Sequence, residues 1–163
     1  MNKAVQITEY KKKHAQEVLN LIVSIQKDEY NLPITASDQP DLMDIENFYQ
    51  TNSGNFWVAE HDSQVVGTLS LLDIGNKEGA MRKMFVAPSY RGMPHKVAKQ
   101  LLEILLSWAK EKDFKNIYLG TTTKFMAAQK FYKKNGFDEI LKTELPSNFP
   151  IVKVDTIFYN YKL

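Results

Sequence analysis

Cysteine is absent from the sequence, and histidine occurs only three times, at His14, His61 and His95. The absence of cysteine excludes disulfides, thiolate metal ligands and a cysteine nucleophile. The three histidines do not follow metal-ligand spacing, so we expect no metal site. No apolar run reaches membrane length and Met1 to Val5 form no apolar leader, so we expect a cytoplasmic protein with no membrane partner.

An excess of one charge is also lacking. The chain has 21 Lys and Arg against 19 Asp and Glu, a net charge of +2, and no basic run interleaved with aromatic residues. Nucleic acid is therefore the partner we expect least. A composition of 44% hydrophobic and 25% charged residues is typical of a globular protein, and no repeat or linker interrupts it. We expect residues 1–163 to form a single domain.

The pattern of apolar residues predicts an α/β fold with a mixed, mostly antiparallel central sheet flanked by helices, in the order β-α-α-β-β-β-α-β-α-β-β. Short turns join the fourth, fifth and sixth elements as antiparallel strands, and the long helix that follows requires a crossover to a parallel strand. The predicted strands are 5–8, 56–60, 65–72, 81–86, 117–119, 137–142 and 152–163, and the predicted helices are 15–25, 42–49, 97–109 and 124–134.

One stretch, residues 84–108, is the most informative. An apolar strand ends at Pro88, a loop containing Arg91 and Gly92 follows, and a helix with a wide apolar face begins near Val97. The first N–H groups of a helix have no partner inside it, and the helix dipole adds positive charge there. The stretch therefore predicts an anion site for a phosphate-bearing ligand. An ordinary connector with solvated basic side chains is the alternative.

Two motifs carry a resemblance to a known family. Residues 86–92, Val-Ala-Pro-Ser-Tyr-Arg-Gly, precede a Leu-rich helix, and residues 128–137 read Ala-Gln-Lys-Phe-Tyr-Lys-Lys-Asn-Gly-Phe. Together with the order of elements, they resemble the GNAT-type N-acetyltransferases over most of the chain. The resemblance implies an acyl-CoA N-acyltransferase fold and direct transfer of acetyl from acetyl-CoA to a primary amine, with no metal.

The resemblance also implies a site. The strands at 81–86 and 117–119 are expected to splay apart, so that the pantetheine arm pairs with the free strand edge and the pyrophosphate binds at the helix start. Tyr132 is expected to protonate the thiolate leaving group, although without the motif its pattern favours a core tyrosine. The cofactor-binding residues implied are Met84, Phe85, Val86, Arg91, Gly92, Met93, Pro94, His95, Lys96, Val97, Ala98 and Tyr132.

The general base is not marked by a motif. Glu60 is our tentative choice, and Asp73 and Glu78 are alternatives at neighbouring strand ends. The loop departs from the family pattern, because Pro94 lacks an N–H and Lys96 stands where glycine is expected.

This departure motivates an alternative, a catalytically inactive acyl-CoA-binding or regulatory module. A purely structural or partner-binding domain is a third hypothesis. The expected partner is a small-molecule or peptide amine. The apolar C-terminal strands suit either a homodimer interface or the core of the domain.

Overall fold

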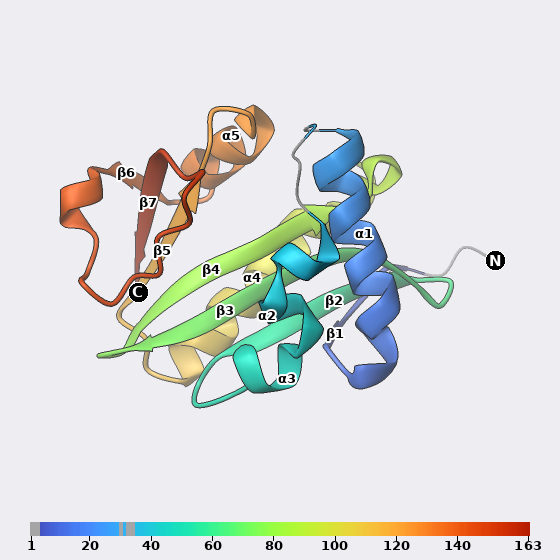
Figure 1. Cartoon of the computed structure of the whole chain (residues 1–163), viewed down its shortest axis with the longest axis horizontal. Helices are drawn as coiled ribbons and strands as arrows, with labels where there is room; N and C mark the ends of the chain where they lie inside the picture. Colours follow the sequence, from blue (N-terminus) through green and yellow to red (C-terminus); the bar gives the residue numbers. More distant parts are fainter. Residues whose placement is uncertain (1–3, 30, 32–34) are drawn as a thin grey trace.

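The computed structural model describes residues 4–29, 31 and 35–163. Within these residues, seven strands form one sheet in the order β1-β2-β3-β4-β5-β7-β6 (Figure 1). Only the β4–β5 pair is parallel, which confirms the predicted mixed sheet. The strands are β1 Gln6–Glu9, β2 Asn55–His61, β3 Gln64–Gly75, β4 Glu78–Val86, β5 Asn116–Thr121, β6 Asp138–Ile140 and β7 Ile157–Lys162.

The helices follow the predicted order with one correction. The helix predicted at 42–49 is two single turns, because Asp44 leaves the helical conformation (φ −152°) and its carboxylate accepts a hydrogen bond from the backbone N–H of Asn47, which starts a new turn. The last strand is also shorter than predicted and begins at Ile157. The helices are α1 Ala15–Asp28, α2 Pro40–Met43, α3 Ile45–Phe48, α4 Val97–Glu111 and α5 Met126–Lys134.

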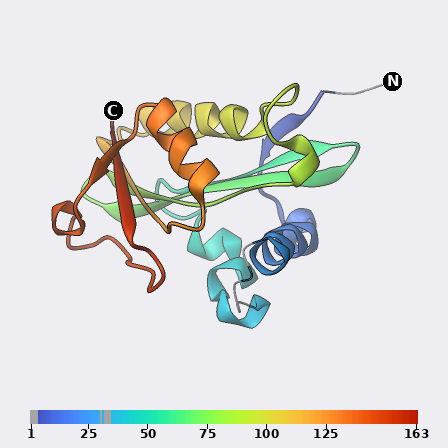
Figure 2. The same ribbon diagram turned by 90° about the horizontal axis from the view of Figure 1, so that it is seen from above.

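The sheet separates two large apolar cores, and Ala80, Phe149 and Phe158 form a third, smaller cluster. Helices α1, α2 and α3 cover one face, and α4 and α5 cover the other (Figure 2). Strand β2 shows why both faces close: Phe56 and Val58 point to the first core, whereas Trp57 and Ala59 alternate into the second. Gly67 of β3 allows the start of α4 to pack against the sheet, since a Cβ there would lie 2.8 Å from a Val97 methyl. In the described part of the chain, no helix has the length and apolar character needed to cross a membrane.

Candidate active site between strands β4 and β5

Strands β4 and β5 pair over only a short distance. Residues 78–80 of β4 pair with 116–118 of β5, and beyond Ala80 the described residues of β4 have no strand partner on that side. Figure 1 shows the two strands meeting at one end and diverging toward α5 and the loop after β4. The predicted splay is therefore present, and it leaves one edge of β4 available to an extended ligand.

A bulge in β4 lies at the point of divergence. Lys83 has a left-handed backbone (φ 59°), and the β3–β4 register shifts beside it. The hydroxyl of Thr68 donates to the Lys83 carbonyl and that of Ser70 to the Arg82 carbonyl, both at 2.7 Å. Consecutive strand residues normally face opposite sides, but the side chains of Arg82 and Lys83 both reach Asp41 of α2. The bulge thus gathers two cations on one face.

The divergence opens into two cavities. The first, which we call the outer cavity, has a volume of about 230 Å³ and a mostly apolar wall. Six predicted cofactor residues line it: Met84, Phe85, Val86, Arg91, Gly92 and Ala98. Its remaining wall was not predicted as part of the site and comes from Ile25, Phe125, Ala127, Ala128 and Phe131.

The second, the inner cavity, has a volume of about 110 Å³ and lies toward the closed end of the divergence. Tyr132 lines it from α5, where its ring is 7% exposed and packs against Phe131, Phe137 and Tyr159. The predicted acid is therefore both a core residue and a cavity residue. The rest of the wall is formed by Met81, Arg82, Lys83, Met84, Phe85, Gly120, Thr121, Phe125 and Ala128.

Arg91 is engaged within the protein. Its guanidinium forms two hydrogen bonds to the Glu29 carboxylate, at 2.6 and 2.8 Å, and its Nε donates to the Val86 carbonyl at 2.9 Å. Arg91 thus joins the end of α1 to the end of β4, and in this arrangement its donors face protein oxygens. The same contact occupies the carbonyl of Val86, one of the predicted cofactor-binding residues.

The remaining predicted loop residues line neither cavity. Met93 is 73% exposed, the His95 ring packs against Tyr90, and Val97 is fully buried in the core. Pro94 and Lys96 complete the turn, with Lys96 in the left-handed conformation just before α4. No side chain of the described residues caps α4, so the N–H groups of its first turn stay available to an anion.

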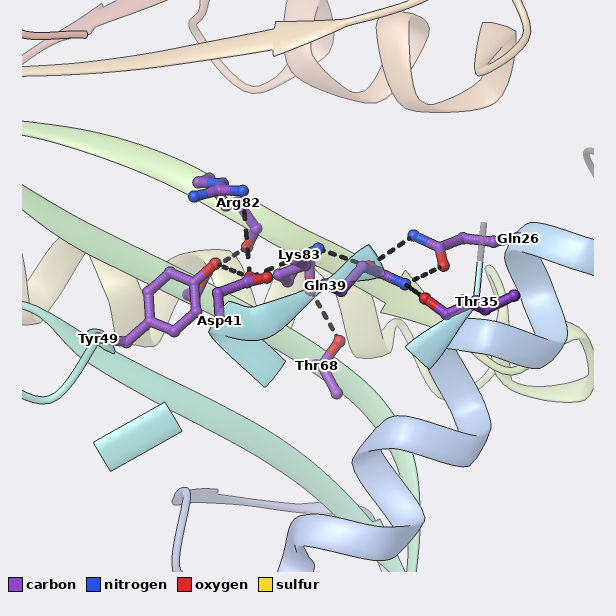
Figure 3. A network of polar contacts seen from close by, with 9 residues as sticks. Gln26, Thr35, Gln39, Asp41, Tyr49, Thr68, Arg82 and Lys83 are labelled. Carbon is purple, nitrogen blue, oxygen red and sulfur yellow. Dashed lines mark hydrogen bonds and ion pairs between the residues drawn. The ribbon is translucent and has the colours of Figure 1, made fainter. Parts of the chain in front are cut away.

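A buried polar network supports the inner cavity from the α2 side (Figure 3). The Asp41 carboxylate accepts a 2.5 Å hydrogen bond from the Tyr49 hydroxyl and lies 3.5 Å from the Lys83 ammonium and 4.0 Å from Arg82. The Lys83 ammonium also donates to the side-chain carbonyl of Gln39 at 2.7 Å. Burial lowers the pKa of Lys83, against the attraction of Asp41, and raises the pKa of Tyr49 well above its ordinary value.

The carboxylates considered as bases lie elsewhere. Glu60 is on β2, where an oxygen contacts His14 Nε2 at 3.1 Å. Asp73 accepts hydrogen bonds from the N–H groups of Ser53 and Gly75, and Glu78 accepts one from the Tyr118 hydroxyl. None of the three lines the outer or the inner cavity.

Asp155, in the loop before β7, is the carboxylate that sequence reasoning missed. It packs on Gly120, where an added Cβ would lie 2.5 Å from its Oδ2. Burial raises its pKa to about 6, and Arg82 and Lys83 oppose this shift. The sequence marks no role for Asp155. The pairing of β7 with β5 places its carboxylate against Gly120, a wall residue of the inner cavity.

These residues fit an acyl-CoA. The unpartnered edge of β4 suits an amide-bearing chain, the outer cavity has the apolar wall that such a chain needs, and the uncapped start of α4 suits a pyrophosphate. Among the described residues, no three His, Asp or Glu side chains gather as metal ligands.

Comparison with known proteins identifies the family that has this fold and these motifs. The profile of the acetyltransferase (GNAT) family matches residues 19–137. The crystal structure of a GNAT-family acetyltransferase from Staphylococcus aureus Mu50 is 43% identical, covers 98% of this chain and 99% of its own, and superposes with a TM-score of 0.93. That of an acetyltransferase from Streptococcus agalactiae 2603 is 32% identical, covers 99% of both chains, and has a TM-score of 0.94.

Curated relatives are longer. N-acetyltransferase 8F1 of Rattus norvegicus is 29% identical over 126 residues, which are 74% of this chain and 56% of that protein. This chain thus spans little more than half of that relative.

Proposed function

The chain belongs to the acetyltransferase (GNAT) family, and from this premise we propose that it transfers acetyl from acetyl-CoA directly to a primary amine. The observation that carries the proposal is the opening between β4 and β5. It combines a free strand edge with two cavities, and the outer cavity reaches Ala98 in the first turn of α4. When bound, acetyl-CoA supplies a thioester whose acetyl carbon is open to attack by a neutral amine.

The residues of the chain supply binding and orientation. The β4 edge at Met84 and Phe85 pairs with the amides of the pantetheine arm, while Gly92 and Ala98 border the path toward the start of α4. The N–H groups there bind the pyrophosphate. Holding the thioester beside an amine lowers the barrier by several kcal/mol, and by about 7–11 kcal/mol in ideal cases.

Tyr132 is proposed as the general acid. Its position in the wall of the inner cavity, which it shares with Arg82 and Lys83 of β4, supports this role. It donates its phenolic proton to the thiolate that leaves. A general acid contributes about 10²–10⁴-fold to a rate.

The test measures release of free thiol from acetyl-CoA with a panel of primary amines. We expect turnover with at least one amine, a loss of about 10²–10⁴-fold in Tyr132→Phe, and an unchanged dissociation constant for acetyl-CoA. Tyr161→Phe, on the half-exposed end of β7, is the matched control. Equal turnover of Tyr132→Phe and wild type would remove Tyr132 from the mechanism.

An acyl-CoA-binding module without catalysis is the second candidate. The ion pair between Arg91 and Glu29 favours this candidate. The pair occupies the guanidinium of Arg91, which was predicted to bind the cofactor. Binding of acetyl-CoA without transfer to any amine of the panel would select this candidate. The acceptor class, small molecule or peptide, stays a prediction, as do the homodimer and the cytoplasmic location.

A further inference from the structure

We propose that Asp155 is the general base of this site and accepts the proton that the acceptor ammonium must lose before it attacks. The inference rests on the acetyl transfer proposed above. Its geometric basis is the inner cavity, whose wall includes Arg82, Lys83 and Tyr132. Another wall residue, Gly120, lies directly against the Asp155 carboxylate.

The position of Asp155 is fixed by backbone contacts. The N–H of Thr156 donates to the Thr121 carbonyl at 2.8 Å, and the N–H of Asp155 donates to the Val152 carbonyl at 3.0 Å. The carboxylate therefore stands directly over Gly120, whose lack of a side chain leaves it room. Gly120 and Thr121 are wall residues of the inner cavity, so Asp155 lies immediately behind that wall.

The carboxylate of Asp155 is unusual in lacking partners. In the described part of the chain, no hydrogen bond or ion pair within 4.0 Å satisfies it. The cations that act on it are Arg82 and Lys83 of β4, both of which also contact Asp41 of α2, while the β5 residues beside it are uncharged. A partly buried carboxylate that keeps its lone pairs unused is suited to receive a proton.

Burial also gives the carboxyl a suitable affinity for that proton. A pKa of about 6 leaves Asp155 ionised at neutral pH but a stronger base than an exposed aspartate. Glu60, by contrast, already contacts His14. It also lies on β2, which β3 separates from β4.

The proposed step balances. The Asp155 carboxylate takes one proton from the ammonium, and the neutral amine attacks the acetyl carbon. The C–N bond forms, the C–S bond breaks, and the thiolate leaves with the Tyr132 proton. The second proton of the former ammonium restores the Tyr132 phenol through solvent, so one proton in all is released, from Asp155.

The experiment compares wild type, Asp155→Asn and the control Asp138→Asn with an amine from the panel, over pH 5 to 9. Asp138 is an exposed aspartate on β6. We expect Asp155→Asn to lower kcat/KM by about 10²–10⁴-fold at pH 7, to lose the acidic limb of the pH profile, and to bind acetyl-CoA as wild type does. Asp138→Asn should match wild type.

A neutral acceptor separates a base from a structural residue. An aminooxy analogue of the acceptor is already unprotonated at pH 7 and needs no base, so Asp155→Asn should process it nearly as fast as wild type. Equal losses with both acceptors would overturn the proposal. Carboxyl-labelled NMR should place the Asp155 midpoint near 6, and a midpoint near 4, the ordinary value, would also overturn it.

The outcomes also separate the two proposals. If Asp155→Asn turns over as fast as wild type and its pH profile keeps the acidic limb, Asp155 is not the general base. The proposal of acetyl transfer is unaffected by that result. Absence of turnover in wild type with every amine refutes the proposed transfer, and with it the role of Asp155.

Discussion

Asp41 and Asp155 act on the same two cations, yet the protein treats them differently. Asp41 is 5% exposed and is held by the Tyr49 hydroxyl, the Lys83 ammonium and Arg82 (Figure 3). Asp155 has only the longer-range attraction of those cations, and burial raises its pKa. A satisfied carboxylate is suited to structure, whereas an unsatisfied one is suited to proton transfer.

The comparison also explains the bulge of β4. In a regular strand, Arg82 and Lys83 would face opposite sides of the sheet. The left-handed backbone at Lys83 accompanies the contact of both side chains with Asp41, and it lies three residues beyond Ala80, the last residue of β4 that pairs with β5. One local irregularity thereby places two cations on one face of the opening.

The largest effect on stability is expected from replacing Asp41. Asp41→Ala leaves Lys83 and Arg82 without a buried counter-charge, and we expect a loss of about 3–5 kcal/mol in the free energy of unfolding, measured with urea. Asp138→Ala should change it by less than about 0.5 kcal/mol. A similar small change in Asp41→Ala would show that the network does not stabilise the fold, and Asp41→Ala/Lys83→Met should recover part of the loss.

Asp155→Asn should stabilise the protein at neutral pH, whereas Asp41→Ala destabilises it. The folded state holds the Asp155 proton up to about pH 6, whereas the unfolded state releases it near its ordinary pKa of 3.8. Wild type therefore loses stability as pH rises through this window, and the neutral variant does not. We expect equal melting temperatures below pH 4 and a higher one for Asp155→Asn above pH 6. A difference that is constant with pH would contradict the account.

The smallest effect is expected at Glu29. The ion pair of Arg91 with Glu29 holds the loop after β4 in place. Glu29→Gln should loosen this loop and weaken acetyl-CoA binding by about two- to fivefold, because an exposed ion pair is worth up to about 1 kcal/mol. Tighter binding would mean instead that Glu29 withholds Arg91 from phosphate. Glu46→Gln, on α3, is the control, and calorimetry is the measurement.

Most of the fold could be predicted from the sequence because its elements carry local signals. Strands such as 56–60 and 65–72 are apolar and joined by short turns, and the helix at 97–109 has one apolar face. The break at Asp44 and the late start of β7 could not be predicted. A capping contact decided the first, and a turn at residues 153–154 precedes the second.

The site was predictable only where a motif marks it. The motifs led to Met84, Phe85, Gly92, Ala98 and Tyr132, which line the cavities. The occupied guanidinium of Arg91 and the position of Asp155 depend on contacts with residues far along the chain, and no local pattern encodes such contacts.

Calorimetric titration with acetyl-CoA tests the central claim most directly, that the opening between β4 and β5 is an acyl-CoA site. The account predicts saturable binding at one site, weaker binding of adenosine diphosphate, and no binding to Ala128→Trp, whose indole would fill both cavities while circular dichroism stays that of wild type. Absence of binding to wild type, or full binding to Ala128→Trp, would contradict it.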